Sequence, residues 1–420
     1  MNYSLPQSLT PHRWPFSLEW LPEAAYLVGG SVRDGLLGRR SSQLDLDFVL
    51  PQHAVDTARA IARHYRTGFV VLDVEHQIAR IVFDAVTADF AEQVGDSLDD
   101  DLRRRDFTIN AIAYHPQTET VVDPLAGRSD LEQKTIRMIS RDNLVEDPLR
   151  LLRAYRQAAQ LDFWIEPATQ DAIEDLAALL KHVAPERVYS ELSYLLSHAK
   201  GTEMLIRAWK SHLLQVWLPC ARWESLQRVQ AVDEAIAQVV TRWHEMGDAL
   251  KRWPRDQQHA VGGGRSWLKV AKLTCLLHDN PAIAEDELWR LKCSRLEVQS
   301  VMAILRHRDL IESGAIANLS RRDLYFLFQD VGDVFPAVAV LAIAAGASVQ
   351  AMTPLIEHFL DPRDPVAHPH PLVTGRDLMA HLNLQPGRQI GKLLSQIQIA
   401  QAEGTVATPE EALVLAQRLL

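Results

Sequence analysis

Apolar and polar residues alternate along this chain in two different ways, and the change falls near residue 124. Before that point, short apolar runs predict strands, and one stretch with apolar residues at helical spacing predicts a helix at 55–65. The predicted strands are 26–28, a run through Asp45 and Asp47, 69–73, 78–83 and 86–90. Beyond it, helical patterns dominate, as at 147–160, 169–181 and 185–197. The pattern predicts an α+β fold, with a small mixed sheet first and an elongated helical remainder.

Prolines divide the chain further. The first 22 residues contain Pro6, Pro11, Pro15 and Pro22. Because proline interrupts a helix, we expect a poorly ordered leader that Trp14, Phe16 and Trp20 attach to the body. Prolines cluster again in DPRDPVAHPHP, 361–371, which predicts a loop before a last helical unit. At 420 residues the chain is too long for one compact core, so several domains are expected.

Composition narrows the class of protein. Hydrophobic residues make up 47% of the chain, yet no run approaches the ~20 apolar residues of a membrane span, and no signal-peptide pattern is present. We therefore expect a cytoplasmic protein that does not enter a membrane. Cys220, Cys275 and Cys293 form no CxxC pair, so buried, inert thiols are expected. The net charge of -10 disfavours indiscriminate nucleic-acid binding, so any RNA contact requires a local basic patch.

Candidate chemistry begins in YLVGGSVRDGLLGRRSSQLDLDFVL, residues 26–50. Asp45 and Asp47 lie two apart on a predicted strand, so their carboxylates share one face while Leu46 and Phe48 point into a core. Mg²⁺ prefers oxygen ligands and usually takes one or two carboxylates plus substrate phosphates. The pair therefore predicts a magnesium site.

The turn before this strand suits a phosphate. Gly29 and Gly30 have no Cβ, so backbone N–H groups can approach a triphosphate, and a helix at 32–37 follows. Arg33 adds a cation for the same anion. A Gly-Gly turn and an Asp-x-Asp pair are each common on surface loops, but in this order and spacing they resemble the signature of nucleotidyltransferases related to DNA polymerase β.

DLRRRDFTINAIAY, residues 101–114, places a cluster of charges directly before an apolar run. One interpretation is a solvated cap at the start of an element. In the functional interpretation Arg105 binds a phosphate, while Asp106 and Asn110 hydrogen-bond a ribose hydroxyl and so favour ribonucleotides. Both interpretations place these residues at the edge of the mixed sheet region.

EDPLRLLRAYRQAAQLDF places charged residues at every third position of a predicted helix. Asp147, Arg150, Arg153 and Arg156 lie along one side of it, and Pro148 suits its first turn. A solvent-facing basic stripe is one interpretation. An acid and a guanidinium one turn apart also fit a base edge, because Asp147 accepts from the amino group of cytosine while Arg150 donates to its ring nitrogen and keto oxygen. Adenine offers a similar edge, whereas uracil and guanine present the reverse order of donors and acceptors. The pair therefore predicts a protein template that accepts C and A.

In order along the chain, GGSVRD, DLD, RRDFTINA, DPLAG, EDPLRLLRAYR and PERVYSEL resemble bacterial-type (class II) tRNA nucleotidyltransferases, the CCA-adding family that includes bacterial poly(A) polymerases. PLVTGRDLM, PGRQIGKLL and TVATPEEAL resemble the family's tail. The resemblance implies a polymerase-β-like head and helical neck, body and tail, with the acceptor end and elbow of tRNA along the helices. The corresponding ranges are a leader at 1–22, the catalytic head at 23–125, a neck with the base-templating helix at 126–200, the body at 201–360 and the tail at 361–420.

The resemblance also implies roles at the matching positions. Gly30 and Arg33 would bind the triphosphate, and Asp45 and Asp47 would bind the Mg²⁺ ions. Arg105 and Asp106 would bind the phosphate and sugar of the incoming nucleotide. Asp147 and Arg150 would bind the base, and Arg153 and Arg156 would support them. A third carboxylate is expected on a neighbouring strand, with Asp89 as the candidate ahead of Asp84 and Asp73. The implied reaction is a two-metal transfer of a nucleotide from CTP or ATP to the tRNA 3′ hydroxyl, with release of pyrophosphate. One ion would activate the hydroxyl and the other would steady the triphosphate.

One departure from the family pattern bears on which nucleotide is added. Between the strand bearing Asp89 and the RRD motif lies only AEQVGDSLDDDLR, where CCA-adding members typically carry a longer flexible stretch. Its loss resembles enzymes that add only CC and leave the terminal A to a separate enzyme. CC addition is therefore favoured over full CCA addition, A addition or poly(A) synthesis.

Two other function classes fit less well. A catalytically silent RNA-binding relative would have lost Asp45 or Asp47, and an enzyme acting on a small molecule would not require the base-reading pair or the helical tail. His278-Asp279 is similar to an HD phosphohydrolase motif, but Asn280 and Pro281 follow it, so a structural role is expected. Candidates for contacts with RNA phosphates are Lys210, Lys269, Lys272, Arg376 and Lys392, although exposed basic residues usually serve solubility.

Overall fold

The computed structural model describes residues 9–39, 44–84, 86–253 and 265–420. Their contacts divide the chain into two compact units, 1–183 with 210–213 and 184–209 with 214–420. The division falls inside the segment 126–200, which the sequence analysis assigns to a neck. All of the candidate catalytic, magnesium-binding and nucleotide-binding residues belong to the first unit, because the last of them is Arg156.

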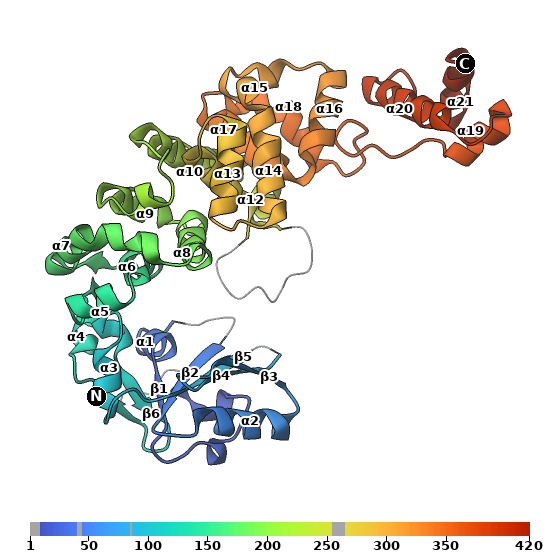
Figure 1. Ribbon diagram of the computed structural model, residues 1–420. Coiled ribbons are helices and arrows are strands. Elements are labelled where there is room, and N and C mark those ends of the chain that lie inside the picture. Colours follow the sequence, from blue (N-terminus) through green and yellow to red (C-terminus); the bar gives the residue numbers. More distant parts are fainter. Residues whose placement is uncertain (1–8, 40–43, 85, 254–264) are drawn as a thin grey trace. The chain divides into compact units, whose positions relative to one another are not determined.

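A seven-stranded mixed sheet organises the first unit (Figure 1). The strand order is β3-β4-β5-β2-β1-β6-β7, and only the β2–β5 pair is parallel. The strands are β1 Tyr26–Val28, β2 Leu44–Leu50, β3 Gly68–Asp73, β4 Ile78–Val82, β5 Val86–Glu92, β6 Ala113–His115 and β7 Thr120–Val122; a second, two-stranded sheet joins β8 Thr135–Ile136 and β9 Trp164–Ile165. The mixed sheet predicted from the sequence is confirmed.

Helices flank this sheet and follow it. They are α1 Gly30–Leu36, α2 Ala54–Tyr65, α3 Leu98–Arg103, α4 Gly127–Glu132, α5 Arg141–Glu146, α6 Leu149–Leu161 and α7 Pro167–Leu176. The predicted helix at 55–65 is confirmed as α2, which packs on β3, β4 and β5 through buried residues such as Ile61. The short helix α5 has no counterpart among the predicted elements, and α1 begins two residues before the predicted start at residue 32.

The described part of the leader is well packed, so the expectation of a poorly ordered segment is wrong for residues 9–22. Trp14 and Phe16 are buried, and their rings lie 5.1 Å and 5.8 Å from that of Phe48 on β2. Leu9 is fully buried as well. These apolar side chains cover the sheet and remove enough surface from water to hold a proline-rich segment in place. Residues 1–8 lie outside the described residues.

The described residues of the second unit form helices joined by loops, without strands, as Figure 1 shows from α8 to α21. Its helices are α8 Pro185–Ser197, α9 Gly201–Lys210, α10 Trp223–Arg242, α11 His244–Lys251, α12 Trp267–Leu276, α13 Pro281–Arg290, α14 Arg295–Arg306, α15 Arg308–Glu312, α16 Arg321–Val331, α17 Phe335–Ala344, α18 Val349–Leu360, α19 Gly375–Leu382, α20 Arg388–Glu403 and α21 Pro409–Arg418. The last residue of α9 and those just after it group with the first unit. The long helical remainder predicted from the sequence is confirmed.

One stretch of the second unit, Arg321–Ala344, is long and apolar enough to cross a membrane. It is interrupted at Gly332, and 67% of its most apolar window is buried inside the fold. Its second half, α17, packs against α10 and α12. These features are those of a core helix, whose apolar residues are covered by other helices.

The last three helices have a small core of their own. Leu378 of α19, Ile397 of α20 and Ala412 of α21 belong to one buried cluster. The segment 361–371 carries no helix or strand and precedes α19, so the loop predicted there is confirmed.

Two lysines proposed as RNA contacts are buried, so that prediction is wrong for Lys269 and Lys272 on α12. Each is at most 1% exposed. The Nζ of Lys269 pairs with Glu297 of α14, and that of Lys272 lies 2.6 Å from a carboxylate oxygen of Asp233 on α10. A buried ammonium requires such a partner, which sequence alone does not reveal. Lys210, Arg376 and Lys392 are exposed.

The cysteines largely follow expectation. Cys275 and Cys293 are buried, and burial raises the pKa of each thiol to about 12. Such thiols form little thiolate near neutral pH and are poor nucleophiles. Cys220 is only partly buried, contrary to expectation, although desolvation still raises its pKa.

Candidate active site

The two acids of β2 lie beside a third carboxylate on the parallel strand β5. In the strand register Asp47 is the partner of Asp89 and Asp45 is the partner of Thr87, whose hydroxyl donates to the Asp45 carboxylate. Leu46 and Phe48 between and beside them are buried, as the alternation of a strand requires. The two acids of β2 therefore share the polar face of the sheet.

Asp89 does not stand free next to Asp47. The guanidinium of Arg80 on β4 donates two hydrogen bonds of 2.7 Å each to its carboxylate oxygens. Among the residues that the structure describes, no three His, Cys, Asp or Glu side chains are placed to hold a metal ion together. The carboxylates available for a divalent ion are accordingly Asp45 and Asp47, which is a set that Mg²⁺ accepts when phosphate oxygens complete its shell.

The glycine turn faces the acids. Gly29, the residue before α1, has a φ of 74°, and a Cβ there would lie 3.2 Å from Oδ2 of Asp47 and 3.5 Å from Nη1 of Arg105. A side chain at this position would thus combine an unfavourable backbone conformation with a close contact. The glycine turn therefore lies close to both Asp47, predicted to bind Mg²⁺, and Arg105, predicted to bind phosphate.

The electrostatics of Asp47 reflect this crowding. Its pKa is raised to about 6, chiefly by burial and also by the negative charges of Asp89 and Asp45, against the opposing effect of Arg105 and Arg80. A carboxylate with a raised pKa beside like charges is stabilised in its ionised form by a bound cation. The residues present therefore fit a divalent ion.

Arg105 lies close to the acids with unused hydrogen-bonding capacity. Its Nη2 donates to Asp101 at 3.1 Å. Its Nε is buried and, among the described residues, has no hydrogen-bond partner. A buried donor without a partner is costly, and an anionic phosphate oxygen would satisfy it.

The RRD segment is tied to α1 through a second set of contacts. Nη1 of Arg33 donates to Oδ1 of Asn110 at 2.8 Å, and Nδ2 of Asn110 donates to Asp106 at the same distance. Arg33 also pairs with Asp34 at 2.9 Å. These bonds hold Arg33 in place and connect α1 to the RRD segment.

Helix α6 faces this segment. Nη1 of Arg153 lies 3.6 Å from Oδ2 of Asp106, and the amide of Gln157 accepts from Asn110 at 3.1 Å. Arg156 donates to Gln160 at 2.6 Å. The predicted stripe of charges is thus directed in part at the sheet unit and is not a purely solvent-facing surface.

The predicted base-reading pair lies where α5 gives way to α6. Oδ1 of Asp147 accepts from the backbone N–H of Leu149, the first residue of α6, at 3.3 Å. The guanidinium of Arg150 donates to the carbonyl oxygen of Asn143 at 2.8 Å, and burial lowers its pKa while Asp106 and Asp147 oppose that effect. Arg150 is therefore held in one orientation and partly withdrawn from water.

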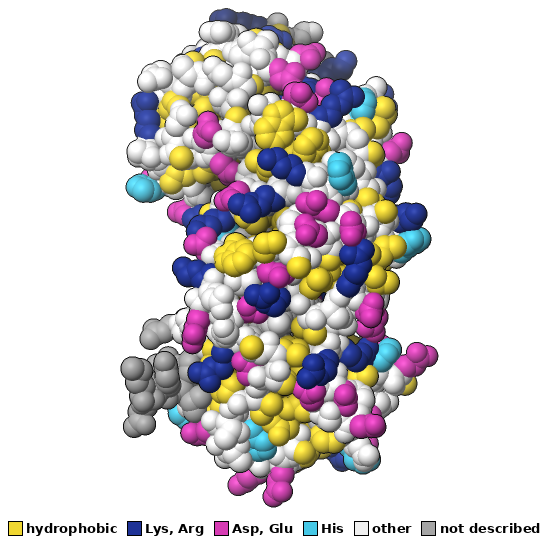
Figure 2. All heavy atoms as spheres, turned by 90° about the vertical axis from the view of Figure 1, so that its left-hand side faces the viewer, with side chains coloured by type: hydrophobic (Ala, Val, Ile, Leu, Met, Phe, Trp, Pro, Cys, Tyr) yellow, Lys and Arg dark blue, Asp and Glu magenta, His cyan; other side chains and the backbone are white. Residues whose placement is uncertain are grey.

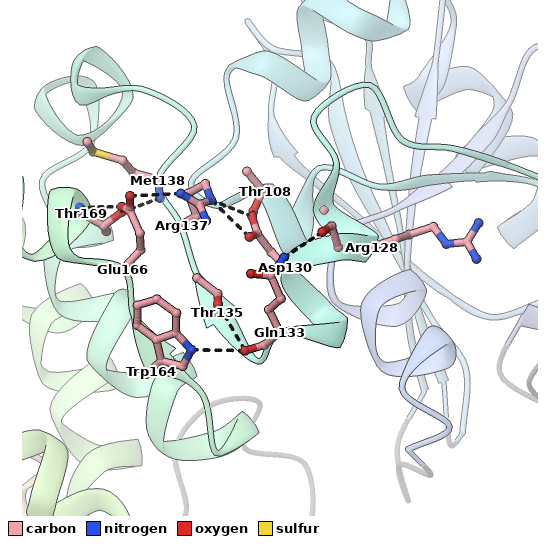
Figure 3. A network of polar contacts seen from close by, with 12 residues as sticks. Thr108, Arg128, Asp130, Gln133, Thr135, Arg137, Met138, Trp164, Glu166 and Thr169 are labelled. Carbon is pink, nitrogen blue, oxygen red and sulfur yellow. Dashed lines mark hydrogen bonds and ion pairs between the residues drawn. The ribbon is translucent and has the colours of Figure 1, made fainter.

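A separate network anchors the RRD segment to the helices that follow it, as Figure 3 shows. Thr108 donates to Asp130 at 2.6 Å, Arg137 donates to both oxygens of Asp130 at 3.1 Å, and Arg137 also reaches Glu166 at 3.0 Å. Glu166 in turn accepts from the backbone and hydroxyl of Thr169. The bridges fix the loop that carries Asp106 and Asn110 against α4, β8 and α7.

Sequence reasoning missed several residues that shape the site. Arg80, Thr87, Asn143 and Gln157 were not among the candidates, and only strand register or helix packing places them there. The alternation of β4 could have indicated that Arg80 projects on one face with its neighbours. Of the weaker candidates for a third acid, Asp84 is exposed after β4, and Asp73 on the edge strand β3 pairs with His76 at 2.9 Å.

The motif similar to an HD site has no metal-binding partners in the described chain. His278 accepts a hydrogen bond from the N–H of Asn280 at 2.8 Å, while Asp279 pairs with Arg308. On the face drawn in Figure 2, basic and acidic side chains are interspersed over the surface. Neither feature adds a second catalytic site.

Three family descriptions match this chain in order. They are the poly A polymerase head domain at residues 25–137, the probable RNA and SrmB-binding site of polymerase A at 162–223, and tRNA nucleotidyltransferase domain 2 (putative) at 265–416. The first match contains Asp45, Asp47, Asp89 and Arg105, whereas Asp147 and Arg150 lie in the segment 138–161 between the first two matches.

Curated relatives match over nearly the whole chain. A CC-adding tRNA nucleotidyltransferase of Synechocystis is 44% identical over 96% of this chain and 96% of its own length. An A-adding tRNA nucleotidyltransferase of Deinococcus radiodurans is 32% identical over 94% of this chain and 96% of its own length. Among solved structures, the Thermotoga maritima CCA-adding enzyme complexed with tRNA has a TM-score of 0.69 at 20% identity, covering 94% of this chain and 91% of that one. The last likeness confirms the fold.

Proposed function

Because this chain belongs to the class II tRNA nucleotidyltransferase and poly(A) polymerase family, we propose that it adds CC to the 3′ end of tRNA from CTP, with release of pyrophosphate. The observation that supports this most directly is the position of Gly29, which lies against both Asp47 and Arg105. A nucleoside triphosphate bound at that turn would lie near the carboxylates of Asp45 and Asp47 and the guanidinium of Arg105. Phosphoryl transfer depends on such positioning of opposite charges.

The family typically uses divalent metal ions, and we propose Mg²⁺ held by Asp45 and Asp47. When bound, the ion would supply Lewis-acid stabilisation of charge that develops on the oxygens of the transferring phosphate. Asp89, held by Arg80, would keep its neighbour Asp47 in place. The Nε of Arg105 would donate to a phosphate oxygen, which removes the cost of leaving it without a partner.

We propose that Asp106 and Asn110 bind the ribose, and that Asp147 and Arg150 read the base. Arg153 supports Asp106 from α6. In this arrangement the amino group of cytosine donates to Asp147, and Arg150 donates to the ring nitrogen and keto oxygen. Uracil presents the reverse order of donors and acceptors and would leave both side chains opposed by like groups.

CC addition is favoured over full CCA addition for two reasons. The segment between β5 and α3 is short, comprising only residues 93–97, and the Synechocystis relative with this specificity is 44% identical over 96% of this chain. Relatives that add A or CCA are also similar, at 32% and 29% identity, so full CCA addition is the second candidate. In the favoured case a separate A-adding enzyme completes the tRNA end.

A nucleotide-incorporation assay tests the proposal. Purified protein is incubated with Mg²⁺, labelled CTP or ATP, and tRNA that lacks its 3′ end or ends in C or CC. We expect two cytidylates on the truncated tRNA and no adenylate on the CC-ended tRNA. Robust adenylate addition to the CC-ended tRNA would instead establish the CCA or A-adding alternative, and no incorporation at all would indicate a silent RNA-binding relative.

The tRNA would lie along the helical part of the protein. Exposed Lys210, Arg376 and Lys392 are proposed to contact its phosphates, since RNA binding depends on such cations. The cytoplasmic location expected from the sequence is part of the same proposal. Binding that weakens as salt rises, measured for wild type against Lys392→Gln and Arg376→Gln, would support the assignment.

A further inference from the structure

We propose that Asn143 is a positioning residue that sets the preference for CTP over ATP. Asn143 lies on α5 and is only 8% exposed. Its side-chain Nδ2 donates to the carbonyl oxygens of Arg103 and Arg105, at 2.7 Å each. Both hydrogens of one amide group thus hold the backbone of the segment that carries the proposed phosphate-binding residue.

The main chain of the same residue holds the proposed base-reading pair. Its carbonyl oxygen accepts from Nη1 of Arg150 at 2.8 Å and from the backbone N–H of Asp147 at 3.2 Å. Asn143 therefore connects Arg105, which meets the phosphates, with Asp147 and Arg150, which meet the base.

This connection fixes the distance between the phosphate site and the base site, so it can discriminate between nucleotides by the size of their bases. A pyrimidine nucleotide places its amino-bearing edge nearer to its own phosphates than a purine nucleotide does. Because cytosine and adenine present similar hydrogen-bonding edges, Asp147 and Arg150 alone discriminate poorly between them. A rigid link between the phosphate site and the base site would reject adenine on length, since hydrogen-bonding groups that miss their partners are left unpaired. This inference rests on the proposed function and identifies what sets its specificity.

An isosteric substitution tests this role. Asn143→Asp keeps the shape but replaces two N–H donors with a carboxylate that faces two carbonyl oxygens, so the connection loosens. We expect kcat/KM for CTP to fall about 10- to 100-fold, mostly through a higher KM, with a smaller fall for ATP, so that CTP/ATP selectivity drops about tenfold or more. Asn318→Asp, the same change at an exposed position, serves as the matched control and should leave both nucleotides unaffected.

A double-mutant cycle separates positioning from a general structural effect. If Asn143 acts through Arg150, the change in selectivity caused by Asn143→Asp should disappear in an Arg150→Ala background. Should Asn143→Asp fail to fold, Asn143→Ser retains one donor and is expected to lose selectivity to an intermediate extent. Equal losses for CTP and ATP, or additive effects in the cycle, would overturn the inference.

The outcomes also distinguish this inference from the proposed function. A wild-type protein that incorporates no nucleotide refutes the proposed function itself. A wild-type protein that prefers CTP, together with an Asn143→Asp variant that folds and keeps the same preference, refutes only the role of Asn143. Dissociation constants for tRNA, measured without nucleotide, should agree between the two proteins within about twofold, because Asn143 is buried.

Discussion

Arg80 and Asp89 face each other across neighbouring strands and share two hydrogen bonds of 2.7 Å. The pair lies directly beside Asp47, whose strand partner is Asp89. An acid expected as a third metal ligand is thus already neutralised by a guanidinium. Arg80 thereby balances part of the negative charge that the sheet gathers at one point and helps to keep Asp47 ionised.

The acids of β2 should be required for catalysis. Replacing Asp47 with Asn removes a carboxylate that holds the proposed Mg²⁺, and we expect CTP incorporation to fall by roughly 10³-fold or more. Asp45→Asn should behave alike. The control is Asp84→Asn, which alters an exposed acid after β4 and should leave the rate unchanged. Near-normal turnover in either β2 variant would contradict the site.

Ion binding should depend on pH through Asp47. Its pKa in the folded protein is raised to about 6, so the carboxylate becomes protonated as the pH falls through that value. Since a divalent ion binds the ionised form, affinity for Mn²⁺ measured without nucleotide should be constant above about pH 7 and fall up to tenfold per pH unit below 6. Affinity that is flat between pH 5 and 7 would argue against Asp47 as a ligand.

Removal of Arg80 should shift the midpoint of this pH dependence to a higher pH. Arg80 lowers the pKa of Asp47 by its charge, and its loss also leaves Asp89 without its partner. The variant Arg80→Gln should therefore need a higher pH for half-maximal ion binding than wild type. Arg59→Gln, which changes an exposed arginine of α2, is the control. If the pH midpoint of ion binding is the same in Arg80→Gln as in wild type, the Arg80–Asp89 pair does not influence the pKa of Asp47.

Gly29 and Gly38 allow backbone strain to be separated from crowding. Both have positive φ, 74° and 66°, but a Cβ at Gly29 would lie 3.2 Å from Asp47, whereas nothing lies within 4 Å of one at Gly38. Alanine at either position should cost on the order of 1 kcal/mol of stability. Only Gly29→Ala should also reduce CTP incorporation, about tenfold or more, because it displaces Asp47. Equal activity of the two variants would disprove the contact.

The buried ion pair of the second unit should be structural. Burial opposes ionisation of Glu297, yet Lys269 beside it holds the pKa of that carboxyl below its usual range. Lys269→Met would leave Glu297 buried without its cation and should destabilise the unit by about 3 to 5 kcal/mol in chemical denaturation. Lys392→Met, at an exposed position, should change stability by less than about 0.5 kcal/mol. Similar stability of both variants would contradict the pairing.

The sequence by itself determined those features that depend on residues close together in the chain. The Asp45-x-Asp47 pair on one face of a strand, the glycine turn before it, and the charged side of α6 all follow from local periodicity, because strands repeat every two residues and helices every 3.6. The order of the motifs from GGSVRD to PERVYSEL was also sufficient to indicate the class II tRNA nucleotidyltransferase family, which the similarity to curated relatives confirms.

Only the tertiary structure decided which distant residues meet. The close approach of Asp47 and Arg105 to Gly29, the neutralisation of Asp89 by Arg80, and the bonds of Asn143 to Arg103, Arg105 and Arg150 span separate elements. It also placed Lys269 in a core, where the sequence had suggested a surface role. Strand order and helix packing create these contacts, and neither is encoded in the spacing of residues along one element.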